Sequence, residues 1–371
     1  LISARFVIII IAGFCYFVSF TMLLPTLPRY IVNELDGNEF QVGLVMGAFG
    51  IAAAVFRPFV GRLGDRFGRR PLLMIGAAIS GLAIWFYPIF LSIPALMLFR
   101  AVNGVGETGA FVGAATAVQD YAPAHRRGEA ASYFSTAVYL AMGLGPFIGE
   151  MLADRGGFDL VCRAGAFTSL VAVVLSMAIP ADLGKAAADA PRSKGLLHHA
   201  AIKPGVLMAL SLLGFMAFSS FIALYLDDLD GNGDTGPVFL LYAGVVLVVR
   251  VGFRKLADTW GSRKTGSLAT LLTASGLAIM AIIGSLVGVY VGTAVMAVGI
   301  ALGYPAFFLL VMADTTDDER SHAVASFSFF FDLPGAFAAP ILGVVIGAAG
   351  SPRAGFAVGS VFALVAFVGL R

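Results

Sequence analysis

The chain has 371 residues, of which 59% are hydrophobic and only 12% are charged, and its formal net charge is +2. Soluble proteins carry about 25% charged residues, so this composition cannot cover a water-facing surface. We therefore expect an integral membrane protein, and the small net charge gives no reason to expect nucleic-acid binding. The two cysteines, Cys15 and Cys162, fall in apolar runs, where we expect small buried residues and no disulfide.

Apolar runs of about 20 residues, the length that crosses a bilayer as a helix, recur along the whole chain. The first run, which follows Arg5, is too long for the apolar core of a secretory signal peptide. The predicted spans are 6–31, 40–60, 72–92, 94–119, 129–152, 160–180, 204–226, 237–256, 266–286, 288–313, 322–348 and 353–370. Because a lipid-exposed backbone must satisfy its own hydrogen bonds, we expect twelve transmembrane helices and an all-α membrane fold.

The loop after the second predicted span is the most informative stretch, and it reads G-R-L-G-D-R-F-G-R-R-P-L-L from Gly61 to Leu73. Its charges must lie at a membrane surface, and its glycines indicate a tight turn between helices that touch. The run resembles the signature of the loop between the second and third helices of major facilitator superfamily transporters. The resemblance implies two six-helix bundles that enclose a central cavity and rock to expose it to each side in turn.

The same resemblance implies a conformational latch. In the family, the acid at the position of Asp65 locks the cytoplasmic ends of the bundles in the outward-open state. We carry this role to Asp65, with Arg69 and the span-4 residue Asp120 as charge partners. The remaining latch residues are Gly61, Arg66, Gly68 and Arg70. The alternative is that the arginines only fix topology and bind anionic lipid.

The two halves of the chain repeat. Residues 35–38 (Leu-Asp-Gly-Asn) recur at 229–232, and other identities follow at offsets of 193 or 194. The aligned pairs include Arg57 with Arg250, Asp65 with Asp258, Gly68 with Gly261, Asp120 with Asp314, and Pro146 with Pro340. Because six spans separate the copies, both have the same orientation, which predicts a parallel pseudo-twofold repeat about an axis along the membrane normal.

We expect residues 1–180 to form the N-terminal bundle, 181–203 a cytoplasmic linker, and 204–371 the C-terminal bundle. The linker's adjacent histidines, His198 and His199, are expected to be solvated, because no further metal ligand is near them in sequence. Fifteen Lys and Arg residues follow even-numbered spans and four follow odd-numbered ones. The positive-inside rule then places both termini in the cytoplasm, in a plasma membrane of prokaryotic inner-membrane type.

Two charged residues lie inside the fourth span, Arg100 and, two turns further on the same face, Glu107. Charges in hydrocarbon are costly and mark pathways or paired groups. Arg100 and the glycines after it resemble the family's span-4 motif, whose arginine is implicated in proton coupling. Glu107 could carry the proton or pair with a cationic substrate. The alternative is that both residues only hold helices together.

The fifth span resembles the family motif associated with antiporters. The motif residues are Gly143, Gly145, Pro146, Gly149 and Glu150. Its glycines are expected to allow close packing between the bundles, and its proline to bend the helix. Glu150 stands where the motif usually has glycine, and we expect it at a water-filled mouth near the outer end, with a coupling site as the alternative.

Asp332 lies in the apolar eleventh span, near the midplane, with no basic residue close in sequence. Such an acid is expected to carry a proton or bind a cation. The alternative is a protonated Asp332 hydrogen-bonded to a helix that Pro334 breaks. Arg57 and Arg250, near the ends of spans 2 and 8, are expected to extend to lipid headgroups, with a substrate role as the alternative.

The candidate cavity-lining aromatic residues are Phe14, Tyr16, Phe17, Phe20, Tyr133 and Tyr139. We predict a proton-coupled antiporter that exports a small amphiphilic molecule or drug. A sugar or metabolite porter, a lipid flippase, and a non-transporting membrane sensor on the same fold are the alternatives. No phosphate-binding loop, dinucleotide fingerprint or metal-ligand cluster occurs, so we expect no enzyme, cofactor or metal. The expected partners are substrate, protons and bilayer, with no nucleic acid, and the expected state is a monomer.

Overall fold

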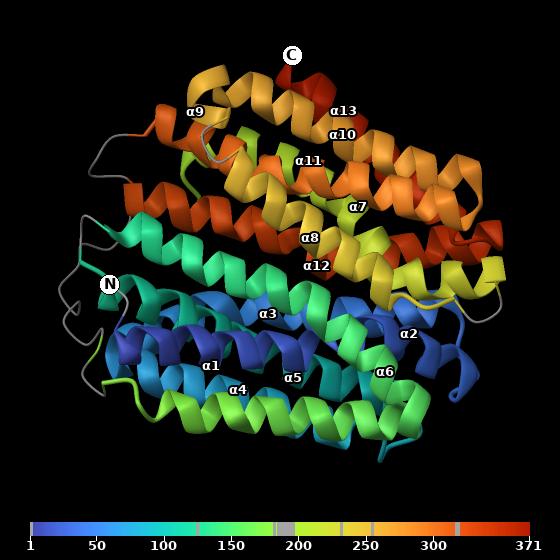
Figure 1. Ribbon diagram of the computed structural model, residues 1–371, viewed down its shortest axis with the longest axis horizontal. Coiled ribbons are helices and arrows are strands. Elements are labelled where there is room, and N and C mark those ends of the chain that lie inside the picture. Colours follow the sequence, from blue (N-terminus) through green and yellow to red (C-terminus); the bar gives the residue numbers. More distant parts are fainter. Residues whose placement is uncertain are drawn as a thin grey trace. The chain divides into compact units, whose positions relative to one another are not determined.

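The structure is a computed structural model that describes residues 3–123, 126–180, 183, 197–230, 233–253, 256–315 and 320–371. All regular structure in these ranges is helical (Figure 1). The helices are α1 (Ala4–Thr21), α2 (Leu23–Asn33), α3 (Glu39–Phe67), α4 (Arg69–Phe86), α5 (Ile93–Tyr121), α6 (Arg127–Ser176), α7 (His199–Asp230), α8 (Gly236–Gly252), α9 (Leu256–Trp260), α10 (Ser262–Ile283), α11 (Leu286–Ala313), α12 (Arg320–Ala349) and α13 (Arg353–Leu370).

These helices fit the twelve predicted spans. Helices α1 and α2 follow each other with one residue between them and together match the first span. Helix α6 contains a sharp break at Gly156 and Gly157, whose backbone is not helical, so it supplies the fifth and sixth spans. Nine described helical segments are long and apolar enough to cross a membrane by length and composition alone. The chain is therefore a multi-pass membrane protein with an all-α fold.

The predicted loop after the second span is reduced to one residue. Helix α3 continues to Phe67 and α4 begins at Arg69, so only Gly68 between them is not helical. Gly68 has φ of 94°, a conformation that residues with a Cβ rarely adopt, which explains the glycine. Gly261 makes a turn of the same kind between α9 and α10, with φ of 90°. The charged run is therefore two helix ends joined by one glycine. The sequence predicts a loop here because charged residues are typical both of loops and of helix ends.

The chain divides into two compact units, residues 1–37 with 48–191, and residues 38–47 with 192–371. Helix α7 begins at His199, so the described end of the predicted linker is helical. His198 is buried, and its backbone N–H donates to Oγ of Ser326 (2.8 Å). The expectation of a solvated His198 is therefore wrong, because the residue packs against α12 instead of facing water.

Small residues bring the helices of the first unit into close contact. Helix α4 lies against α5, and α1 lies against α6 (Figure 1). A Cβ at Gly106 would lie 2.6 Å from the backbone nitrogen of Ser80, and one at Gly76 would clash with the backbone of Ala110. Such backbone-to-backbone contact is the usual way in which helices associate in a membrane, where lipid removes the hydrophobic drive.

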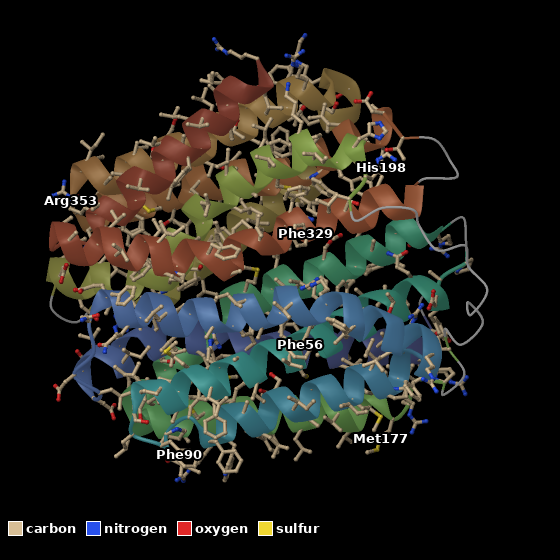
Figure 2. The ribbon with its side chains drawn as sticks, turned by 180° about the vertical axis from the view of Figure 1, so that it is seen from behind. Phe56, Phe90, Met177, His198, Phe329 and Arg353 are labelled. Atoms are coloured by element: carbon tan, nitrogen blue, oxygen red, sulfur yellow. The ribbon has the colours of Figure 1, made fainter. Side chains whose placement is uncertain are left out.

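The second unit repeats this construction in α10 and α11. A Cβ at Gly299 would lie 2.6 Å from the backbone nitrogen of Thr273, and one at Gly276 would lie 2.5 Å from the carbonyl oxygen of Gly292. At the far end of α10, the guanidinium of Arg353 donates to the carbonyl oxygens of Ala281 and Ile282 (both 2.7 Å) (Figure 2). These bonds satisfy the last carbonyls of a helix, which have no partner within it.

Candidate functional site

The crossing of α3 and α5 in the first unit builds the candidate site. The hydroxyl of Thr108 donates to the carbonyl oxygen of Ala53 (3.2 Å). One turn earlier on both helices, a Cβ at Gly104 would clash with the carbonyl oxygen of Phe49. The next turn of α3 carries Arg57, so the crossing directs this residue toward the middle of α5.

Arg57 and Glu107 form an ion pair in this unit. Nη2 of Arg57 lies 3.6 Å from Oε2 of Glu107, and 22% and 11% of the two side-chain surfaces are exposed. Cζ of Arg57 also lies 5.2 Å from the centroid of the Phe111 ring. Phe56, the residue before Arg57, marks this part of α3 in Figure 2. Arg57 therefore contacts a carboxylate and an aromatic face instead of extending to headgroups, because its partner lies on another helix.

Arg100 lies two turns from Glu107 and is 1% exposed. Its Nη1 donates to Oδ1 of Asn103 (3.0 Å), and Nδ2 of Asn103 donates to Oγ of Ser80 (2.6 Å). Its Cζ also lies 5.4 Å and 4.6 Å from the rings of Phe20 and Phe49, which stack on each other. Amide and aromatic contacts of this kind offset part of the cost of burying a guanidinium.

The aromatic residues predicted to line a cavity do not share one environment. Tyr16 is fully buried, so it belongs to the interior of the unit. Phe17 is also buried and meets Phe111 edge-on, with ring centroids 5.9 Å apart. The others are half-buried or exposed: Phe14, Phe20, Tyr139 and Tyr133.

The antiporter-like motif of α6 packs inside the first unit. A Cβ at Gly145 would clash with Thr21, and one at Gly149 would clash with the carbonyl oxygen of Met22. These contacts join α6 to α1 and α2, whereas the sequence suggested close packing between the bundles. The other two small motif residues, Gly143 and Pro146, are buried.

Glu150 is not a residue of a water-filled mouth. It is buried, and its Oε1 lies 2.5 Å from Nη1 of Arg29 on α2. The prediction was wrong because the sequence does not show that α2 and α6 bring these two charges together. The pair instead neutralises an acid that the motif's close packing would otherwise bury alone.

Most of the predicted latch residues lie where α3 meets α4, and Asp120 lies near the end of α5. Nε of Arg69 donates to Oδ2 of Asp120 (2.8 Å), which joins the two predicted charge partners. Arg66 is exposed, Arg70 is half-buried, and Gly68 is the turn itself. Gly61 lies within α3. The side chain of Asp65 lies outside the part of the molecule that the structure describes, so the contacts of the central acid are left as a prediction.

Asp332 belongs to α12, but its side chain also lies outside the described part of the molecule. Helix α12 runs through Pro334, so the alternative of a helix broken at this proline is wrong. Among the described side chains, no three His, Cys, Asp or Glu residues come together in a way that could hold a metal ion.

Sequence reasoning missed several residues that contact the charged cluster, and it missed the partner of Glu150. We define the charged cluster as Arg57, Arg100 and Glu107. Asn103 follows Arg100 by three residues on the same helix face, a spacing that could have identified it. Ser80, Phe111 and Arg29 carry no such signal, because they come from other helices or from an apolar pattern.

The chain matches known transporters over most of its length. A family model described as Major Facilitator Superfamily matches residues 9–339. An uncharacterised MFS-type transporter of Salmonella typhimurium is 26% identical over 344 residues, which cover 90% of this chain and 87% of that protein. The quinolone resistance protein NorA of Staphylococcus aureus is 24% identical over 62% of this chain and 63% of its own. The solved structure of the nucleoside transporter NupG has a TM-score of 0.78 at 14% identity, covering 99% of this chain and 98% of that one.

Proposed function

Because the chain belongs to the major facilitator superfamily and is a transporter, not an enzyme, we propose that it exports small amphiphilic molecules in exchange for protons. The two units would act as the two bundles of an alternating-access carrier, with the linker and both termini in the cytoplasm. The substrate would bind from the cytoplasmic side and leave on the outer side, and the proton would travel in the opposite direction.

The observation that carries this proposal is the ion pair between Glu107 and Arg57. A carboxylate inside a membrane protein is stable only when a proton, a cation or a hydrogen-bonding partner compensates its charge. Glu107 is only partly exposed and lies on the same helix as the buried Arg100. A group that can exchange one compensating partner for another is suited to couple a proton to a second molecule.

Two further features support export by antiport. NorA, which matches the chain at low identity, is named for resistance to quinolones. The α6 motif that resembles the antiporter signature is tightly packed against α1 and α2. We also propose Asp332 as a second acid on the proton path and Asp65, with the Arg69–Asp120 pair, as the latch.

The test is transport in proteoliposomes that contain the purified full chain. A pH gradient is imposed, and the movement of ethidium, a planar amphiphilic cation, is followed by fluorescence. We expect flux that an acidic lumen drives and that nigericin, which collapses the pH gradient, reduces to the level of protein-free liposomes. Flux that valinomycin abolishes and nigericin leaves unchanged would contradict proton coupling.

A further inference from the structure

The neighbours of the Arg57 guanidinium form a cation-binding site. A carboxylate oxygen of Glu107 lies 3.6 Å from Nη2, and the ring of Phe111 lies 5.2 Å from Cζ. A carboxylate on one side and an aromatic face on the other are the two features that recognise planar organic cations. The structure thus shows this site holding a planar, delocalised cation that belongs to the protein itself.

The aromatic wall of this site is fixed by its neighbours. The ring of Phe111 meets Phe17 at 5.9 Å and Phe134 at 6.1 Å, and Phe17 and Phe134 meet each other at 6.2 Å. These residues come from α5, α1 and α6, so three helices hold the ring in place. A guanidinium that leaves would therefore expose a preformed wall, and a preformed site costs little ordering free energy on binding.

Arg57 is less enclosed than Arg100, the other arginine near Glu107. Its side chain is 22% exposed, whereas Arg100 is almost completely enclosed. Its separation from Glu107 is also longer than the 2.5 Å of the Arg29–Glu150 pair. An entering cation would compensate the Glu107 charge in place of Arg57, so the exchange leaves no unpaired carboxylate.

We propose that Arg57 is a tethered ligand that occupies the substrate site of the Glu107 carboxylate between turnovers. This inference rests on the proposed antiport, and it specifies the order in which the proton, Arg57 and the substrate occupy Glu107. The proton leaves Glu107, Arg57 covers the carboxylate, and a planar organic cation then displaces Arg57 from both Glu107 and Phe111. Without Arg57, the carboxylate would stand uncompensated after the proton has left, which a low-dielectric interior penalises strongly.

The test measures equilibrium binding of ethidium to the purified full chain at pH 8.5, where the proton competes least. A tethered competitor weakens binding, so Arg57→Gln is expected to bind ethidium about threefold to tenfold more tightly than the unmodified protein. Glu107→Gln is expected to lose ethidium binding. The matched control is Arg29→Gln, which removes the guanidinium of the Arg29–Glu150 pair in the same unit and should leave ethidium affinity unchanged.

The opposite result for Arg57→Gln overturns the proposal. If the guanidinium instead recognises an anionic group, Arg57→Gln will weaken binding of 1-anilinonaphthalene-8-sulfonate and will not tighten binding of ethidium. An equal increase in ethidium affinity in Arg29→Gln would also overturn the proposal, because a general loosening of the first unit would then explain the tighter binding.

A second measurement uses the unmodified protein and does not depend on the folding of a variant. Proton release on ethidium binding is recorded in weak buffer at pH 7. Because Arg57 and not a proton is displaced, we expect release close to zero, and release of about one proton per bound dye contradicts the tethered ligand. Failure of the proposed antiport is distinguished because it would abolish gradient-driven flux while leaving these binding results unchanged.

Discussion

The α4–α5 pair of the first unit and the α10–α11 pair of the second are built in the same way but differ in what they bury. Gly106 and Gly299, which correspond at the 193-residue offset, both bring their helix onto the backbone of its neighbour. At the same offset, however, the charged and amide residues of α5 do not recur. The corresponding pairs are Arg100 with Thr293, Asn103 with Met296, and Glu107 with Ile300.

This difference separates what the fold needs from what the function needs. Helix α11 has no charged residue between Leu286 and Ala313, and it still packs as closely as α5. Small residues are therefore sufficient for helix association, as expected in a membrane. The charged residues of α5 are an addition that costs free energy, and such additions mark functional positions.

The largest expected change in stability tests the close helix packing that α4–α5 and α10–α11 share. Gly106→Ala and Gly299→Ala should each destabilise the protein by about 1–3 kcal/mol, because each new methyl group meets a backbone that cannot move freely. Thermal unfolding in detergent measures the change. Gly244→Ala on α8 is the control, because a Cβ there would meet nothing within 4 Å. A loss confined to one of the two glycines would show that the packing is not equivalent.

The next prediction concerns the buried guanidinium of Arg100, which has no counterpart in the second unit. Asn103→Leu removes the acceptor that Nη1 of Arg100 uses and leaves a buried guanidinium with one partner fewer. The expected cost is about 1–3 kcal/mol, accompanied by loss of transport. Unfolding and flux are measured on the same preparations. Stability and flux equal to those of the unmodified protein would show that Asn103 is only a packing residue.

A smaller effect concerns the predicted latch. Asp120→Asn breaks the pair with Arg69, in which 31% of the Asp120 side chain is exposed, so stability should change by less than about 1 kcal/mol. Turnover should nevertheless fall several-fold, while ethidium affinity stays constant. Arg126→Gln, which breaks the more exposed pair with Glu129, serves as the control. A matching loss of affinity in Asp120→Asn would contradict a latch.

The smallest effect tests the apolar character of α11. The hydroxyl of Thr293 is buried and makes no hydrogen bond to another residue within the described part of the chain. Thr293→Val removes this polar group at almost constant volume, so stability should stay the same or rise by up to about 1 kcal/mol. Thermal unfolding provides the value, and a marked loss of stability would reveal a polar role for α11 that the comparison denies.

The features predictable from sequence are those that follow from local pattern. The hydrophobic runs predict the spans, and the glycines of the 61–73 segment predict a tight turn, because both features depend on residues that are close in sequence. The chain past residue 60 was interpreted as loop because the charges at the end of α3 resemble one. The pairs Arg57–Glu107 and Arg29–Glu150 could not be predicted, because each joins residues on different helices whose crossing depends on tertiary packing.

The central claim is that the charged cluster of the first unit couples transport to protons, and one pair of variants tests it most directly. Glu107→Gln and Glu150→Gln each neutralise a buried acid that pairs with an arginine in this unit. Both are placed in proteoliposomes, and ethidium flux is measured with and without a pH gradient. The account predicts that Glu107→Gln loses the response to the gradient while Glu150→Gln keeps it. An undiminished response in Glu107→Gln would contradict the account.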